Sequence, residues 1–238
     1  MQLTNSVRTS RGVPAETLDD IRQFDTCTIA NAIEGFGVRL RNEGFTLPGL
    51  RPVTEPFPRL LGYAATWRVR SGEPPMTGNA YAERTDWYGE IERLAKPRVA
   101  VIQDLDNGRG LGSSVGEVHA AILKAFGCGG VISDGAVRDV PAVAAMGFPM
   151  FARTVSVSHS YAHVVDYGKP VKIFGLEIRP GDLVYADCHG VVSIPLEIAA
   201  DVPRRAAEIR ARERRILDLC RSPEFSAERL RTALRGDS

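Results

Sequence analysis

The stretch that decides the fold is GEVHAAILKAFGCGGVISDGAVRD, residues 116–139. Apolar residues recur at helical spacing in its first half, and Gly127 is placed to end that helix. A short buried strand is predicted at residues 130–134, followed by the pair Arg138 and Asp139. Twenty residues separate Glu117 from this pair. We therefore expect three charged groups to meet at one end of a single helix–strand unit.

The segments around this unit predict an α/β fold. Strands are expected at residues 60–70, 98–104 and 148–153, and helices at 79–95 and 139–146. Strands that alternate with helices connect by right-handed crossovers, which implies a partly parallel sheet. Residues 154–195 consist of short strand-like runs separated by turn signals, so an antiparallel layer is expected there.

Helices are predicted at both ends of the chain. Residues 17–36 fit helical spacing with a break near Asp25 and Thr26. Residues 196–219 form a long amphipathic pattern, and a short last helix is predicted after Pro223. We expect an N-terminal arm over residues 1–16, one domain over 17–220 and a helical tail over 221–238.

Composition excludes several classes of protein. The 238 residues are 44% hydrophobic and 25% charged, with a formal net charge of +1. These values are typical of a globular protein with a substantial core and give no reason to expect a nucleic-acid or membrane partner. The four cysteines form no CxxC pair, so neither a zinc knuckle nor a disulfide framework is predicted. No signal peptide or apolar span is evident, and we expect a cytoplasmic protein.

The charged side chains within residues 116–139 are of the types that bind a small anionic ligand which chelates a metal. Oxygens of Glu117 and Asp139 are ligands that hard divalent cations prefer, and the planar guanidinium of Arg138 suits a carboxylate. A glycine-rich loop that enters a helix offers backbone N–H groups to an anion.

Structural roles also explain the same residues and are favoured by the spacing alone, since helix caps are far commoner than active sites. Ser114 and Glu117 have the spacing of a capping box, and Asp139 before Val140 and Pro141 looks like a helix N-cap with proline in the first turn. Arg138 could simply pair with an acid. Both explanations stay open at this point.

The block GEVHAAILKAFGCGGVISDGAVRDV resembles the class II pyruvate aldolases that cleave 4-hydroxy-4-methyl-2-oxoglutarate and 4-carboxy-4-hydroxy-2-oxoadipate. That family also includes the RraA-type regulators of ribonuclease E. Its signature is an acidic residue, twenty residues and then Arg-Asp. The resemblance extends to residues 25–37 and 179–195 and covers most of residues 17–215.

The resemblance implies a layered β/β/α domain of the swivelling type and a role for each residue of the block. Asp139 would bind Mg²⁺ or Mn²⁺, with Glu117 orienting a water on the metal, and Arg138 would hold the carboxylate of a 2-keto acid substrate. Gly116, Val118 and His119 would bind substrate, the last two through backbone N–H groups. Assembly as a homotrimer or homohexamer is also implied.

The implied function is a metal-dependent lyase that releases pyruvate through its enolate, with oxaloacetate decarboxylation as a side activity. The alternative is a non-catalytic RraA-type protein that binds an RNA-degrading enzyme. The sequence departs from the family pattern at Asn31, where aspartate is usual, and at Glu117, where the aldolases tend to carry aspartate. Residues 71–90 form an unusually long insertion, so the second product is left open.

Other polar residues have simpler explanations. His159 and His163 are four residues apart but lack the glutamate of an HExxH site, so exposed or packed histidines are expected. His189 could line a neighbouring subunit's pocket. The arginines of residues 204–215 are interrupted by acids, which favours a solvated helix face, with a subunit contact as the alternative.

Overall fold

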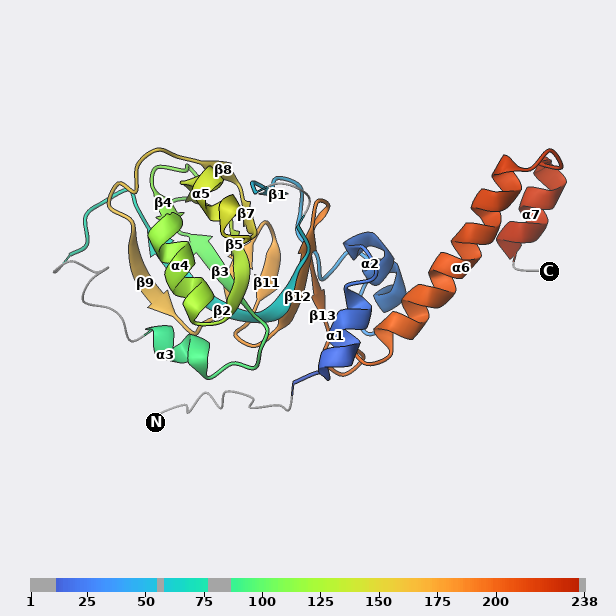
Figure 1. The fold of residues 1–238 in the computed structure, drawn as a ribbon, viewed down its shortest axis with the longest axis horizontal. Coiled ribbons are helices and arrows are strands. Elements are labelled where there is room, and N and C mark those ends of the chain that lie inside the picture. The colour runs from blue at the N-terminus through green and yellow to red at the C-terminus, as the bar shows by residue number, and fades with distance from the viewer. Residues whose placement is uncertain (1–11, 55–57, 77–86, 236–238) are drawn as a thin grey trace.

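The computed structural model describes residues 12–54, 58–76 and 87–235 (Figure 1). Its main sheet runs in the order β1-β7-β5-β3-β2-β12-β13, and β9 also pairs with β2. The bounds are β1 Arg51–Pro52, β2 Leu60–Arg70, β3 Arg98–Asp104, β5 Cys128–Ser133, β7 Met150–Ala152, β9 His163–Tyr167, β12 Leu183–Asp187 and β13 Gly190–Ile194.

Helices connect the parallel strands, as predicted. β2, β3, β5 and β7 pair in parallel. Between them lie α3 (Trp87–Glu92), α4 (Glu117–Ala125) and α5 (Val140–Ala145). The strands β9, β12 and β13 pair antiparallel, which confirms the expected antiparallel part of the sheet. The predicted helix over residues 79–95 is described only from Trp87 onward, because residues 77–86 lie outside the described part of the chain.

The sheet separates two cores, and alternate residues of each strand face opposite sides. Val99 and Val101 of β3 pack with the hairpin formed by β10 (Val171–Ile173) and β11 (Leu176–Ile178). Ala100 and Ile102 face the other core, which α3, α4 and α5 cover. Hairpin, sheet and helices therefore form three layers, and the predicted β/β/α arrangement is confirmed.

Three helices from the ends of the chain pack on β12 and β13 and form a third core. They are α1 (Ala15–Ile21), α2 (Thr26–Glu34) and α6 (Val202–Arg221), while the last helix, α7 (Ala227–Arg235), contacts α6. The predicted break is confirmed, because Asp25 caps α2 by accepting a hydrogen bond from the Thr28 N–H at 2.7 Å. Figure 1 shows α6 extending away from the sheet, with α7 folded back beside its far end. None of the helices in the described ranges is both long and apolar enough to cross a membrane.

A second, small sheet was not predicted. It consists of β4 (Ser113–Val115), β6 (Ala136–Val137) and β8 (Thr154–Val155), all parallel. The expectation that residues 154–195 are antiparallel throughout is therefore wrong for β8. This sheet joins the loops that follow β3, β5 and β7, and so it brings the start of α4 beside the Arg138–Asp139 pair.

Buried acids lie where β3 and β5 end. Asp104 and Asp134 are nearly inaccessible, and the Asp134 carboxylate accepts a hydrogen bond from the Asp104 N–H at 2.6 Å. Burial raises the pKa of Asp134 to about 6 and also raises the pKa of Asp104. The folded protein therefore holds the Asp134 proton more tightly than the unfolded chain does. The stability that this proton supplies is present below pH ~4 and is lost as the pH rises through 6.

Asp134→Asn should raise the stability of the protein at neutral pH. The amide mimics the protonated acid and keeps an oxygen for the Asp104 N–H. We expect a gain of about 2 kcal/mol at pH ~7.5 that largely disappears at pH ~4. Urea denaturation of both proteins at the two pH values measures it, and a variant that is less stable than wild type at the higher pH would contradict the pKa assignment.

Candidate active site

The small sheet brings Glu117, Arg138 and Asp139 together. The backbone N–H of Arg138 donates to the Val115 carbonyl at 2.9 Å, which places the pair beside the start of α4. An oxygen of the Asp139 carboxylate accepts a hydrogen bond from the Glu117 N–H at 3.1 Å and lies 3.5 Å from the Arg138 Nε. The three residues that the motif singled out therefore form one cluster.

The predicted caps are not formed as expected. Ser114 lies in β4, and Gly116 is the N-cap of α4 without a side-chain cap, so the capping box is wrong. Asp139 does precede α5 with proline in the first turn, but its side chain does not cap that helix. Its backbone is left-handed, with φ of 54°, and its carboxylate instead caps α4. A non-glycine residue held in this region is typical of a functional position.

The Asp139 and Arg138 side chains approach the backbone of Gly116 so closely that this position requires glycine. A Cβ at this position would overlap the Asp139 carboxylate and would lie 3.1 Å from the Arg138 side chain. Gly116→Ala should therefore push both side chains out of place. We expect turnover at this site to fall by about 100-fold, because catalytic clusters depend on sub-ångström placement. Steady-state kinetics measures the loss of turnover, and a circular dichroism melt checks that the variant is folded. Wild-type kinetics in the variant would show that the close approach of Gly116 to the Asp139 carboxylate is unimportant.

A cavity of about 730 Å³ opens at the cluster. Its walls come from the start of α4, the Arg138–Asp139 pair, the loop before β9, and residues on either side of the segment 77–86. The lining residues are Pro75, Tyr88, Ser113, Ser114, Gly116, Glu117, Val118, His119, Ile122, Arg138, Asp139, His159, Ser160, Tyr161, Ala162 and His163. Every residue predicted to bind substrate or metal is in this set.

His119 is largely buried at the base of the cavity. Its Nδ1 contacts the Ser114 carbonyl at 2.9 Å, and its ring packs edge-on against Trp87 with centroids 5.5 Å apart. Burial lowers the pKa of His119, so the ring is neutral at pH 7. Since a carbonyl can only accept a hydrogen bond, the proton is on Nδ1 and Nε2 carries the lone pair.

Residues of β9 and of the loop before it also line the cavity. His159 and Tyr161 lie in the loop, and His163 begins β9. The histidines are exposed or half-buried, as expected, but their place in the cavity is not predicted by the sequence. Ser113 fixes this loop, because its N–H donates to the Ser158 carbonyl at 2.8 Å and its hydroxyl to the Ser156 carbonyl at 2.9 Å. Gly112 permits the approach, since a Cβ there would overlap the His159 carbonyl.

The donor set at the cluster fits a hard divalent cation. Glu117 and Asp139 are two carboxylates that line one cavity, and both are accessible to solvent. Over the described residues, the only grouping of three metal-binding side chains lies elsewhere, at residues 187–189. Mg²⁺ is commonly held by one or two carboxylates and retains several waters, whereas structural zinc takes four nitrogen or sulfur ligands. The cluster therefore suits Mg²⁺ or Mn²⁺.

The remaining predicted features lie outside the cavity. His189 is in the turn between β12 and β13 and is not among the lining residues. On α6, Arg204 and Arg205 both bond Glu208, and Arg214 pairs with Asp218. The predicted ion pairs within this helix are therefore confirmed, while the choice between a solvated face and a subunit contact stays a prediction.

The fold and the cavity together define a class of protein. It has a β/β/α domain in which an Arg–Asp pair and the N-terminus of a helix line one cavity. A family model for RraA-like proteins, described as Aldolase/RraA, matches residues 26–193. The chain belongs to this RraA-like family, which covers aldolases as well as RraA proteins.

Individual relatives come from both branches of the family. A protein of Halalkalibacterium halodurans, provisionally named 4-hydroxy-4-methyl-2-oxoglutarate aldolase, is 30% identical over 209 residues, which are 84% of this chain and 90% of the relative. A crystal structure from Pseudomonas syringae pv. tomato is similar at 25% identity with a TM-score of 0.72, covering 97% of this chain and 99% of that one. RraAS2 of Streptomyces coelicolor, described as an unusual member of the RNase ES inhibitor RraA family, shares the fold at 22% identity with a TM-score of 0.68, covering 86% and 97%.

Proposed function

We propose that the protein is a divalent-metal-dependent lyase that cleaves a 4-hydroxy-2-keto acid to pyruvate and a carbonyl compound. The observation that carries the proposal is the convergence of Glu117, Arg138 and Asp139 at the start of α4, inside one cavity. The provisional aldolase name of the Halalkalibacterium relative supports the same reaction.

The cluster offers a separate partner for each part of the pyruvoyl group. The Arg138 guanidinium binds the carboxylate through two parallel hydrogen bonds. The first turn of α4 lines the cavity, and the bond from the Ala120 N–H to the Gly116 carbonyl is the first to close within the helix. The N–H groups of Val118 and His119 in this turn stabilise negative charge on the substrate's oxygens.

Asp139, with Glu117 beside it, would hold Mg²⁺ or Mn²⁺. The bound cation supplies Lewis-acid stabilisation of the negative charge that develops at the 2-keto oxygen. The Glu117 carboxylate, exposed at the cavity wall, takes the proton of the C4 hydroxyl through a water. The C3–C4 bond then breaks, its electron pair enters the C2–C3 bond of the enolate, and C4 becomes a carbonyl. Return of the proton to C3 completes pyruvate.

The aromatic and aliphatic side chains of the cavity favour an uncharged group on C4. Tyr88, Ile122 and Tyr161 line the cavity, and Arg138 is the only lysine or arginine among the described lining residues. These residues offer no second fixed positive charge to a second carboxylate of the substrate. We expect kcat/KM for substrates with an alkyl or aryl group on C4 to exceed that for 4-hydroxy-4-methyl-2-oxoglutarate by about tenfold or more. The reverse order in a substrate panel would contradict this assignment.

The alternative, a non-catalytic RraA-type regulator, predicts no turnover. Such regulators tend to have lost the acid and Arg-Asp signature, which this chain retains as Glu117, Arg138 and Asp139. The lyase is therefore favoured. A homotrimeric or homohexameric assembly and a cytoplasmic location remain predictions that gel filtration with light scattering and cell fractionation would test.

A coupled assay tests the lyase directly. Purified protein with Mg²⁺ or Mn²⁺ is mixed with a panel of 4-hydroxy-2-keto acids and with oxaloacetate, and pyruvate is followed through lactate dehydrogenase. We expect pyruvate release that chelation by EDTA abolishes and added metal restores. No pyruvate from any member of the panel would overturn the proposal and leave the regulator as the remaining candidate.

A further inference from the structure

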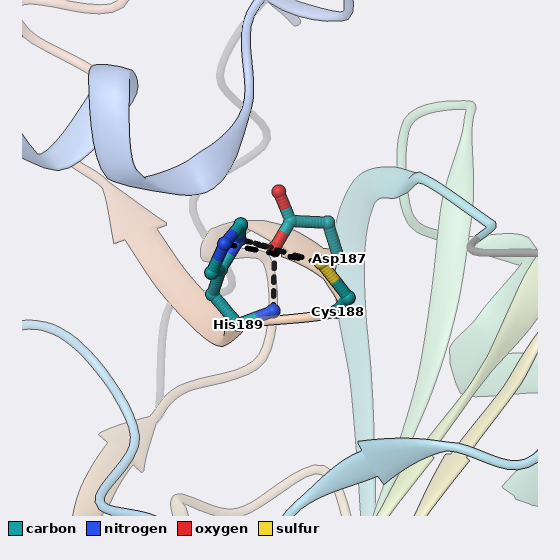
Figure 2. A group of neighbouring side chains, drawn as sticks. All are labelled: Asp187, Cys188 and His189. Carbon is teal, nitrogen blue, oxygen red and sulfur yellow. Dashed lines mark hydrogen bonds and ion pairs between the residues drawn. The ribbon is translucent and has the colours of Figure 1, made fainter.

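The turn between β12 and β13 gathers three different metal-binding side chains. Asp187, Cys188 and His189 are consecutive, and their donor atoms all lie within 4.8 Å of one another (Figure 2). The His189 Nδ1 lies 3.0 Å from the Asp187 Oδ1 and 3.5 Å from the Cys188 Sγ. A carboxylate, a thiol and an imidazole therefore meet at one point, away from the cavity of the candidate active site.

These separations are close to those of a metal site. Zinc bonds of about 2.3 Å to sulfur and about 2.0–2.1 Å to nitrogen or oxygen, in a tetrahedron, place neighbouring ligand atoms roughly 3.4–3.6 Å apart. The observed 3.0 and 3.5 Å need only a small adjustment to reach this spacing. A cation would take the place of the proton that the His189 Nδ1 shares with Asp187.

The carboxylate of the group is rigid and charged. Thr26, the first residue of α2, donates its N–H to the Asp187 Oδ2 at 2.8 Å and its hydroxyl to the Oδ1 at 2.7 Å. Burial favours the neutral acid, but the hydrogen bonds from Thr26 and His189 outweigh it and lower the pKa of Asp187. One ligand is thus preorganised, while Cys188 and His189 are exposed and accessible to an ion.

The donors of the group are a sulfur, an imidazole and a carboxylate. This combination prefers borderline-soft ions over Mg²⁺.

We propose that Asp187, Cys188 and His189 form a binding site for Zn²⁺ or a similar borderline-soft divalent cation, separate from the hard-metal cluster at Glu117 and Asp139. Three protein ligands leave a fourth position for water. Because Asp187 already holds the start of α2, the ion would fasten the β12–β13 hairpin to the N-terminal helices. Binding should therefore raise the melting temperature.

Zinc titration of the full chain tests the site. The protein is stripped with a chelator, kept reduced, and titrated with Zn²⁺ by calorimetry in excess Mg²⁺, which occupies the hard-metal cluster. Cys188→Ser and His189→Gln each remove one ligand without touching the bonds between Asp187 and Thr26. Cys220→Ser, an exposed cysteine on α6, is the matched control.

We expect one Zn²⁺ per chain, with affinity at least ~10-fold weaker in Cys188→Ser and in His189→Gln and unchanged in Cys220→Ser. Co²⁺ in place of Zn²⁺ should give a thiolate-to-metal absorption band that Cys188→Ser abolishes. No zinc binding by wild type, or equal affinity in wild type and the two ligand variants, would overturn the proposal. This readout does not depend on pyruvate formation, so it stands apart from the proposed lyase.

Discussion

Arg138→Ala is expected to lower kcat/KM for pyruvate release by roughly 10³-fold, equivalent to about 4 kcal/mol of transition-state stabilisation. The guanidinium is the only fixed positive charge among the described lining residues, so the substrate carboxylate would lose its bidentate partner. The coupled pyruvate assay measures the loss over a range of substrate concentrations.

Two control variants test whether the loss of activity is specific to the Arg138 guanidinium. Arg138→Lys keeps the charge without the planar fork and should recover only part of the activity, because an ammonium binds as a point charge. Arg214→Ala removes an exposed arginine of α6 and should leave the kinetics unchanged. If Arg138→Ala kept kcat/KM within about threefold of wild type, its assigned role would be wrong.

Asp139→Ala is expected to abolish metal binding at the cluster together with turnover. It removes a carboxylate suited to the cation and also the cap on the Glu117 N–H. The lost cap alone should cost about 1 kcal/mol of stability. Electron paramagnetic resonance measures Mn²⁺ binding by the variant, and the pyruvate assay measures its turnover. Together they distinguish loss of the metal from loss of the fold.

Asp139→Asn is the matched variant for this residue. Asparagine tolerates the left-handed backbone at φ of 54° and still offers an oxygen to the Glu117 N–H, but it carries no charge. We expect a melting temperature close to wild type with activity lost. Metal-dependent turnover at the wild-type rate in Asp139→Asn would rule out the proposed metal ligand.

The parts of the fold that could be predicted are those with long periodic signals. The helix after Gly116 and the parallel strands around it follow from apolar spacing alone, as does the break before α2. The small sheet could not be predicted, since β6 has two residues and β4 three, too few to show any alternation. The inference that Glu117 and Asp139 come together rested on the motif, whereas the contact itself depends on that sheet.

Local capping rules also failed for a physical reason. Ser114 has the right spacing to cap α4, but its backbone is engaged in β4, and a carboxylate from a different loop caps the helix instead. The place of His159 and His163 in the cavity could not be predicted, because the loop before β9 is held there by Ser113, a contact distant in sequence. Both cases are long-range contacts that overrule a local pattern.

The two-residue strand β6 also determines which changes the site can tolerate. Its pairing with β4 and β8 fixes the position of the Arg138–Asp139 pair, which directly follows it, relative to the start of α4. Inserting or deleting one residue between Gly135 and Val137 would shift this pair out of its place beside α4, although every residue of the motif would still be present. A mutational scan should therefore find this segment permissive to conservative substitution and intolerant of any change in length.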